Sequence, residues 1–417
     1  MRARIKFTLF FVFLISDVCL GWTTKFFSYP FAPEKFLAVD KEKQKLFVVE
    51  SKSPLKKKEV FACKTGENKG DKWKEGDKKT PEGVYFIEGK ISKGINVEKY
   101  GELAFILNYP NPVDVIKGKK GHGIWIHGRG YLVDNYRTKG CVALSYYDIR
   151  KLKKDIKIGK TPVIIAKRID WVEDKFDERL VYNMVLFIKK WANLWSEKNK
   201  KFFDFYDLKF YSKNYKNIYV FKRQKMRFFK NHQWIDVSLY DPKIIFGPDY
   251  IVTYFYQAYV CPGFSSFGIK RLYWMKKDNK WKIVGEEWRN IDSFLVKSMY
   301  LKDRAKSILT WLNCWKDAWV SADLKRYGSF YCIDAVQQNI KGKDKILEYK
   351  KKIWAEDPPK NISIIHPKVR LTDKGFLVSF VQKYESKKGY KDKGKKKLLI
   401  IPNRGRWLIK SESWSRY

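Results

Sequence analysis

The stretch GHGIWIHGRGYLVDNYRTKGCVAL, residues 121–144, is the most informative part of the sequence. An apolar strand ends in His127-Gly128, and a polar loop follows it. Gly140 and Cys141 then lead into an expected helix. Glycine beside the thiol lets the backbone turn sharply and lets a substrate carbonyl approach. A histidine at a strand end and a cysteine in a glycine turn together predict a nucleophilic site on a β-rich fold.

Cys141 and His127 have the chemistry of a nucleophile and its base. A thiol attacks as the thiolate, and a neighbouring imidazole can generate the thiolate by accepting the proton. The amides of Gly140 and Cys141, just before the expected helix, can donate to the oxyanion of a tetrahedral intermediate. The second ring nitrogen of His127 needs an acceptor, for which a backbone carbonyl would serve. The alternative is a structural cysteine and histidine, but their shared glycine-flanked segment favours catalysis.

The surrounding sequence, residues 35–168, alternates short apolar runs with polar turns, which is typical of a β-rich domain. Strands are expected at Phe36–Val39, Lys45–Glu50, Glu59–Lys64, Gly83–Glu88, Leu103–Leu107, Gly123–His127 and Thr161–Ala166. A short helix is expected at Ser145–Lys154. Gly66–Pro81 is polar, contains several glycines and is interpreted as a surface loop.

This combination resembles the L,D-transpeptidase (YkuD-type) catalytic domain, which is marked by His-Gly, a loop and Ser/Thr-x-Gly-Cys. The matching residues are His127-Gly128 and Thr138-Lys139-Gly140-Cys141. Three flanking segments also look similar: GDKKTPEGVYFI (76–87), NYPNPVD (108–114) and GKTPVIIA (159–166). The resemblance implies a β-sandwich-like fold and acyl transfer through a cysteine.

The resemblance also implies roles for these residues and a substrate. Cys141 would be the nucleophile and His127 its base, with the Gly128 carbonyl orienting His127. The amides of Gly140 and Cys141 would form the oxyanion hole. The scissile bond would join the L-centre of a diamino acid to the following D-alanine in peptidoglycan stem peptides. The candidate substrate-binding residues are Arg129, Thr138 and Lys139.

Two features differ from many family members. Histidine commonly precedes the Gly-Cys pair and Arg or Asn lies two residues after the cysteine, whereas Lys139 and Ala143 occupy these positions here. The spacing of 14 residues from His127 to Cys141 is also short. These differences set the chain apart from a standard cross-linking transpeptidase but leave the acyl-enzyme chemistry intact. We therefore expect water to accept the acyl group, as in an L,D-carboxypeptidase, with a cross-linking L,D-transpeptidase as the alternative.

The C-terminal half contains an internal repeat. KWKIVGEEW (280–288) recurs as RWLIKSESW (406–414), 126 residues later. A Trp-rich segment lies ahead of each copy, with the pairs Trp191, Trp195 and Trp315, Trp319. Residues four apart share one face of a helix, so each copy is expected to begin with a helix and to continue with long aromatic strands.

A helix packed across a curved antiparallel sheet explains this order. The pattern is similar to the cone-shaped nuclear-transport-factor-two-like (SnoaL-like) domains. The expected organisation is a signal peptide at 1–21, a YkuD-type domain at 35–168, and cone-shaped domains at 180–292 and 303–417. The expected fold class is therefore mixed, with a β-rich sandwich and two α+β cones. A YkuD-type domain followed by such a domain resembles the L,D-carboxypeptidases that set cell shape in curved and helical bacteria.

The N-terminus has the layout of a secretory signal. Arg2, Arg4 and Lys6 precede an apolar run at 7–15, and small residues precede a cut after Gly21. The run is shorter than an ordinary membrane span, so we expect cleavage rather than a retained anchor, with no membrane span afterwards. The protein is expected in the periplasm or cell envelope.

The amino-acid composition limits the kinds of molecule that the protein is expected to bind. The chain has 87 Lys and Arg against 45 Asp and Glu, a net charge of +42, and such a surface attracts polyanions. Nucleic acid is not expected, because no nucleic-acid motif is present and an exported protein meets anionic lipids and wall carboxylates instead. The oligomeric state is left open.

The cysteine and histidine counts limit the chemistry further. Six cysteines occur, and losing Cys19 with the signal leaves five, so at least one thiol is unpaired. There is no Cys-x-x-Cys pair and only four histidines, so neither a structural zinc site nor a cofactor is expected. A non-catalytic wall-binding scaffold is a second alternative, which the set of His127, Gly140 and Cys141 disfavours.

Overall fold

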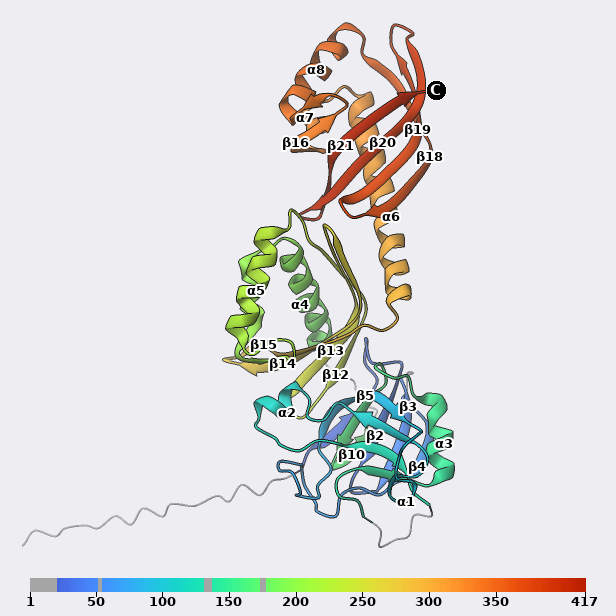
Figure 1. Ribbon diagram of the computed structural model, residues 1–417, viewed down its shortest axis with the longest axis vertical. Helices are drawn as coiled ribbons and strands as arrows, with labels where there is room; N and C mark the ends of the chain where they lie inside the picture. Colours follow the sequence, from blue (N-terminus) through green and yellow to red (C-terminus); the bar gives the residue numbers. More distant parts are fainter. Residues whose placement is uncertain (1–20, 52–54, 131–136, 173–177) are drawn as a thin grey trace, which may run out of the picture. The chain divides into compact units, whose positions relative to one another are not determined.

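The computed structural model describes residues 21–51, 55–130, 137–172 and 178–417. The chain divides into two compact units; in Figure 1 most of the first is coloured blue to green and most of the second green to red. The first unit comprises Met1–Phe27, Glu34–Pro110 and Lys119–Asp174, and the second comprises Ser28–Pro33, Asn111–Gly118 and Lys175–Tyr417. Of the expected signal segment 1–21, only Gly21 is among the described residues. No described helix is long and apolar enough to span a membrane.

The first unit is built on an eight-stranded sheet with the order β4-β3-β2-β9-β5-β6-β7-β8. Its strands are β2 (Lys35–Asp40), β3 (Lys45–Glu50), β4 (Lys56–Ala62), β5 (Gly83–Ile91), β6 (Ala104–Leu107), β7 (Trp125–Gly128), β8 (Val142–Leu144) and β9 (Pro162–Ala166). The apolar runs of β2 and β9 are buried and pair in parallel at the centre, as expected for strands covered on both faces. Each strand expected from the sequence has a counterpart here.

The structure adds elements that the sequence pattern does not predict. Strand β1 (Thr23–Phe26) pairs in parallel with β10 (Arg168–Trp171), and these four-residue segments lie at opposite ends of the unit's sequence. The expected helix at 145–154 is confirmed as α3 (Tyr146–Leu152) and a 3-10 turn (Lys153–Asp155). Helix α1 (Val97–Tyr100) is a single turn with Asn96 as its N-cap.

The second unit contains two copies of one helix-on-sheet domain, here named copy 1 (residues 178–289) and copy 2 (residues 293–416). Copy 1 has α4 (Glu178–Ser196), a 3-10 turn (Lys200–Phe205), β11 (Tyr206–Tyr211), α5 (Ile218–Asn231), β12 (Asp236–Phe246), β13 (Tyr250–Cys261), β14 (Phe264–Lys277) and β15 (Lys280–Arg289). Copy 2 has α6 (Ser293–Val320), α7 (Leu324–Gly328), β16 (Tyr331–Gln337), β17 (Ile340–Lys341), α8 (Lys343–Glu356), β18 (Pro359–Thr372), β19 (Gly375–Ser386), β20 (Lys391–Asn403) and β21 (Arg406–Arg416).

The two copies share their topology, which confirms the internal repeat. The sheet order is β11-β15-β14-β13-β12 in copy 1 and β17-β16-β21-β20-β19-β18 in copy 2. Lys270 lies opposite Trp288 in the first sheet, as Lys396 lies opposite Trp414 in the second. Figure 1 shows α4 and α5 on the same side of the curved sheet of copy 1. The expected mixed fold class, a β-rich domain with helix-on-sheet cones, is therefore confirmed.

Helix α6 serves both copies, because its first turns pack on copy 1. Val296 and Tyr300 belong to the same buried cluster as Trp234 of copy 1. Arg304 makes a bidentate pair with the carboxylate of Asp236, at 2.7 Å from Nε and 2.6 Å from Nη2, and the hydroxyl of Tyr300 donates to the same carboxylate. A bidentate guanidinium–carboxylate pair fixes orientation as well as distance, so it joins the copies in one arrangement.

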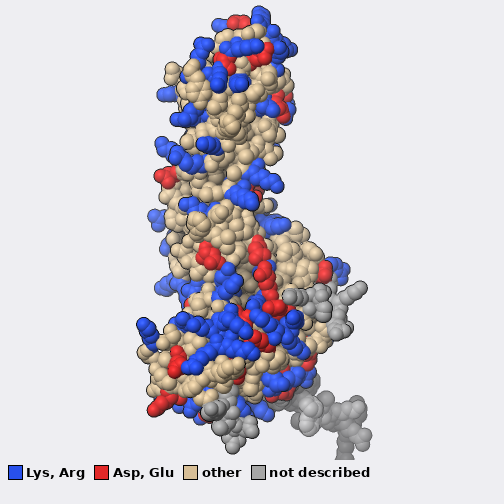
Figure 2. Space-filling view, turned by 90° about the vertical axis from the view of Figure 1, so that its right-hand side faces the viewer, with Lys and Arg blue, Asp and Glu red and all other residues tan. Residues whose placement is uncertain are grey.

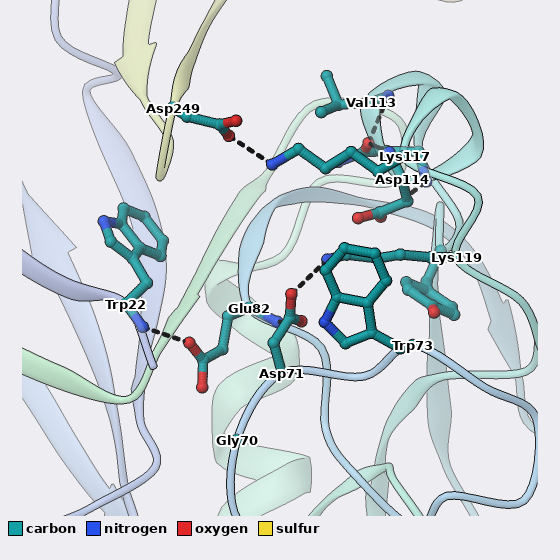
Figure 3. Close-up of polar contacts among 12 residues, drawn as sticks. Trp22, Gly70, Asp71, Trp73, Glu82, Val113, Asp114, Lys117, Lys119 and Asp249 are labelled. Carbon is teal, nitrogen blue, oxygen red and sulfur yellow. Dashed lines mark hydrogen bonds and ion pairs between the residues drawn. The ribbon is translucent and has the colours of Figure 1, made fainter. Parts of the chain in front are cut away.

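Two short segments from the first half of the chain also belong to the second unit. Helix α2 (Pro112–Ile116) is capped by Asn111, whose side chain donates to the Tyr250 hydroxyl at 3.2 Å. Lys117 pairs with Asp249 at 2.6 Å (Figure 3). Part of the NYPNPVD segment therefore packs on copy 1.

Each copy buries three charged side chains in its interior, near the tryptophan pair of its first helix. In copy 1 these are Lys225, Lys270 and Glu286, and in copy 2 they are Lys350, Lys396 and Glu412. Every one of the six is at most 9 % exposed. A carboxylate with two lysines leaves one positive charge in excess in each copy, which is costly unless the surroundings offset it. Cation–π contacts do so in part, because the Lys225 ammonium lies 3.9 Å from the Trp195 ring and that of Lys350 lies 4.3 Å from Trp319.

Candidate active site

His127 and Cys141 come from neighbouring strands of the first unit. His127 lies in β7, and Cys141 directly precedes β8. The two strands are parallel, with His127 opposite Ala143. Because side chains alternate along a strand, Cys141 shares the face of Ala143 and thus that of His127. Backbone hydrogen bonds of Ala143 with Lys64 hold β8 from its other side.

The imidazole of His127 is buried and held by its own backbone. Its Nδ1 lies 3.0 Å from the Gly128 carbonyl oxygen, and the Tyr100 ring packs edge-on at 5.2 Å. Burial lowers the pKa of His127, an effect that the bond to Gly128 opposes and the charge of Arg129 reinforces. The ring is therefore neutral at pH 7. With Nδ1–H donating to Gly128, Nε2 is free to accept a proton.

The thiol of Cys141 is half-buried, with Sγ 3.6 Å from the Gly123 carbonyl oxygen. Burial raises the pKa of Cys141, while a backbone hydrogen bond from Trp125 and the charge of Lys72 lower it in part. Both the Cys141 thiol and the His127 imidazole are thus neutral in the resting state. Such a pair forms the thiolate as the thiol attacks, in contrast to a preformed ion pair.

The turn before the thiol depends on glycine. Gly140 has φ +133°, and a β-carbon there would lie 2.9 Å from the Lys79 carbonyl oxygen. The Gly140 amide donates to the Thr138 hydroxyl at 3.0 Å, and that hydroxyl donates to the Cys141 carbonyl at 2.7 Å. The expected two-amide oxyanion hole therefore differs from the geometry, because Gly140 is already engaged. The Cys141 amide has no hydrogen-bond partner among the described residues.

The segment after the thiol also differs from the expectation. Cys141 leads into strand β8, not a helix, and α3 begins only at Tyr146. Val142, Ala143 and Leu144 are fully buried, which explains why this short apolar run pairs as a strand. The dipole of α3 therefore does not point at the thiol from directly behind it.

The Gly66–Pro81 segment contributes to the site although it was interpreted as a surface loop. Thr80 is fully buried, and its hydroxyl accepts from the Gly66 amide at 2.8 Å and lies 3.5 Å from the Cys141 carbonyl. The amide of Glu67 donates to the Thr138 carbonyl, and the Thr138 amide donates to that of Thr65. The loop therefore holds the turn that carries the thiol.

Comparison with known proteins identifies two kinds of domain in this chain. Residues 34–165 match the L,D-transpeptidase catalytic domain (YkuD), and residues 183–287 and 307–413 each match the Cds6 C-terminal NTF2-like domain. The chain belongs to the L,D-transpeptidase (YkuD) family, with two NTF2-like domains. No curated protein sequence matches it.

Two solved structures resemble much of this YkuD-family protein. Bd1075 of Bdellovibrio bacteriovorus is 30 % identical with a TM-score of 0.52, covering 63 % of this chain and 94 % of that chain. The helical cell shape determining protein Pgp2 of Campylobacter jejuni is 25 % identical with a TM-score of 0.50, covering 65 % of this chain and 95 % of that chain. Each alignment therefore leaves about a third of this chain without a counterpart.

A second polar cluster borders the YkuD site and was not found by sequence reasoning. The Lys72 side chain is 4 % exposed and donates to Asp77 at 2.6 Å. Asp77 also accepts from the amides of Trp73, Lys74 and Lys79. Burial alone would raise the pKa of Asp77, but these donors lower it to about 2. Asp77 thereby holds Lys72, whose charge lowers the pKa of Cys141.

The candidate substrate-binding residues have different surroundings. Thr138 is buried and both sides of its hydroxyl are used within the turn, so it stabilises the loop. Lys139 is exposed, and Arg129 lies 3.5 Å from the Lys99 carbonyl oxygen. Part of the loop from Arg129 to Thr138 lies outside the described residues.

The described cysteines are all free thiols: Cys63, Cys141, Cys261, Cys314 and Cys332.

Proposed function

We propose that this YkuD-family protein is a cysteine-dependent L,D-carboxypeptidase that removes D-alanine from peptidoglycan stem peptides. The observation that carries the proposal is the arrangement of Cys141 and His127. Their side chains share one face of adjacent parallel strands, and the Gly128 carbonyl leaves Nε2 of His127 free to accept a proton. A base on the same face as the thiol, with a ring nitrogen free to accept a proton, supports general-base activation of Cys141 by His127.

The reaction uses the groups of the site in turn. Nε2 of His127 takes the thiol proton while Sγ of Cys141 attacks the carbonyl carbon of the L-diamino acid–D-alanine bond. The Cys141 amide, which is unpartnered among the described residues, donates to the oxyanion. The C–N bond then breaks, and the imidazolium protonates the amine of the departing D-alanine. Water, deprotonated by His127, then attacks the thioester carbon. The C–S bond breaks, the imidazolium returns the proton to the thiolate of Cys141, and the shortened stem peptide leaves with a free carboxylate.

Water is the proposed acceptor because of residues beside the thiol. Ala143 occupies the position where many family members have Arg or Asn, and Lys139 the position where many have His. Ala143 is fully buried in β8 and Lys139 is exposed. Cross-linking requires an amine held in line with the acyl carbon and shielded from water. A cross-linking L,D-transpeptidase is the alternative product of the same acyl-enzyme, and a wall-binding scaffold is the non-catalytic one.

The proposed setting is the bacterial cell envelope, and the proposed role is the control of cell shape. Pgp2 is a helical cell shape determining protein, and its structure aligns with 65 % of this chain. Lys and Arg side chains are spread over the face in Figure 2, with fewer Asp and Glu between them. A net charge of +42 favours association with the carboxylates of the cell wall.

Product analysis tests the proposal directly. Purified protein is incubated with tetrapeptide muropeptides, and products are followed by mass spectrometry from the earliest times. We expect tripeptides to dominate, with no products from Cys141→Ala. Dominance of cross-linked dimers would replace the carboxypeptidase proposal with a transpeptidase, and unchanged substrate with both proteins would favour the scaffold.

A further inference from the structure

The start of the described chain makes a contact that the proposed reaction does not explain. The backbone nitrogen of Trp22 donates to Glu82 Oε2 at 2.5 Å, as the dashed line in Figure 3 marks. The carbonyl of Trp22 accepts from the Lys167 amide at 2.9 Å, and strand β1 begins at the next residue. Trp22 is therefore held on both sides of its α-carbon.

Glu82 is a buried carboxylate that joins several parts of the unit. It is 3 % exposed, and its Oε1 accepts from the Lys41 ammonium at 2.9 Å. Lys41 also donates to the carbonyls of Gly70 and Thr80 at 2.5 and 2.7 Å. Thr80 in turn contacts the carbonyl of Cys141. Glu82 thus lies between the N-terminal strand and the loop that holds the thiol turn.

A cation is the partner that best suits the second oxygen of Glu82. Charge-assisted hydrogen bonds to a carboxylate are about twice as strong as neutral ones, and a buried carboxylate is costly unless paired. In the intact chain Trp22 offers only an amide. The expected signal ends at Gly21, so a cut there would turn this same nitrogen into an α-ammonium group.

We propose that processing between Gly21 and Trp22 creates an α-ammonium group that pairs with Glu82 and fixes the loop behind the thiol. An export-linked endopeptidase would use water to hydrolyse the Gly21–Trp22 bond, leaving a carboxylate on Gly21 and the ammonium on Trp22. Glu82 is then a positioning residue, because it acts on Cys141 through Lys41 and Thr80.

The surrounding charges are consistent with this pairing. Asp71 accepts from the Glu82 amide at 2.8 Å and pairs with Lys119 at 2.6 Å. The new ammonium and Lys41 would each face one oxygen of Glu82, while Lys119 stays with Asp71. An α-amino group has a reference pKa of about 8, and an adjacent carboxylate raises it, so the group is charged at neutral pH.

The test compares full-length chains that differ only at the N-terminus. One begins at Trp22, released from a fusion by a protease that leaves no extra residue, and the other carries Gly-Ser ahead of Trp22. Each is made with Glu82 and with Glu82→Gln, and Glu67→Gln serves as the control because Glu67 is an exposed partner of Lys78. Urea unfolding of the first unit and the rate of Cys141 alkylation by iodoacetamide are measured.

We expect the extension to raise the unfolding equilibrium constant about 5- to 30-fold and to change the alkylation rate, with both effects absent in Glu82→Gln and intact in Glu67→Gln. The stabilisation should be full below the unfolded pKa of the α-amino group and should vanish as pH rises through its raised folded pKa. Equal stability of the two chains with Glu82 would overturn the proposal, as would an exported protein whose mass shows a different first residue. Neither readout uses a stem peptide, so the proposed activity can fail without affecting this result.

Discussion

The YkuD site and the interiors of the two NTF2-like copies both bury ionisable groups, but they do so in opposite ways. At the site, burial lowers the pKa of His127 and raises that of Cys141, so both groups are neutral. In copy 2, burial alone would raise the pKa of Glu412, yet Lys396 and Lys350 lower it, so the groups stay charged. The charged groups around a buried ionisable side chain therefore determine whether it is neutral and reactive or stays charged in a buried ion pair.

The comparison also explains where chemistry can occur. The thiol of Cys141 is half-buried and reachable, and few side chains compete for it. Glu412, in contrast, is occupied by Lys396, Tyr331 and Gln337, all within the closed interior of copy 2. A group saturated by such partners stabilises a fold, whereas one with a free lone pair or proton can react.

The largest effect should follow from removing the nucleophile. Cys141→Ala is expected to abolish the release of D-alanine because no other described thiol shares a strand face with His127. The fold should persist, since the change removes one half-buried atom. Product formation is followed by mass spectrometry and folding by circular dichroism. Wild-type turnover by the Ala variant would show that Cys141 is not the nucleophile.

The next largest effect should come from the base. His127→Ala is expected to lower the rate about 10²–10⁴-fold, the usual contribution of general-base catalysis, and to slow alkylation of Cys141 by iodoacetamide. His122→Ala is the matched control, because the His122 side chain is 82 % exposed. Equal alkylation rates in wild type and His127→Ala would show that the two groups do not act as a pair.

Breaking a sealed ion pair should affect stability but not thiol chemistry. Glu412→Gln leaves two buried lysines without their carboxylate and should destabilise copy 2 by about 3–5 kcal/mol in urea unfolding. Because the pKa of Glu412 is lowered, its stabilisation is present above the unfolded pKa and is lost as pH falls through the folded one. Glu356→Gln, on the exposed face of α8, should change little. A changed alkylation rate of Cys141 in the Gln variant would show that the buried charges of copy 2 influence the thiol.

A smaller effect of opposite sign is expected from Lys225. Burial lowers its pKa to about 7, so the unfolded state binds the proton more tightly and copy 1 gains stability as pH rises from about 7 towards 10. Lys225→Met should stabilise copy 1 by about 1–3 kcal/mol at about pH 6, and it should flatten this pH dependence. Unfolding in urea at several pH values measures both. A destabilised Met variant at that pH would mean that the cation–π contact with Trp195 outweighs the burial of charge.

Much of the YkuD site was predictable because its signals are local. His127 ends an apolar strand, and Gly140 precedes Cys141 within one short segment, so spacing and glycine chemistry identified them without distant contacts. The NTF2-like copies were predictable for a related reason. Two copies of one pattern in a single chain, with tryptophans four residues apart, indicate the same helix face twice.

Other features depend on contacts between distant segments. Thr80 contacts Cys141 across 61 residues, so the sequence placed it in a segment similar to the family but gave no sign that its hydroxyl supports the thiol turn. The role of Lys72 depends on Asp77 and on the fold that brings both near Cys141. The helix after Val142–Leu144 was expected, but no strand was assigned to these three residues, because so short an apolar run has no periodicity that distinguishes strand from helix.

By itself, the sequence predicted the class of chemistry and the candidate pair of Cys141 and His127, and it determined the duplicated domain, because these depend on residue identity and short-range spacing. The tertiary structure alone decided that the Gly140 amide is bound to Thr138, that Thr80 holds the thiol turn and that Trp22 meets Glu82. Hydrogen bonds require donor and acceptor within about 3 Å, and only the folded chain brings such distant groups together.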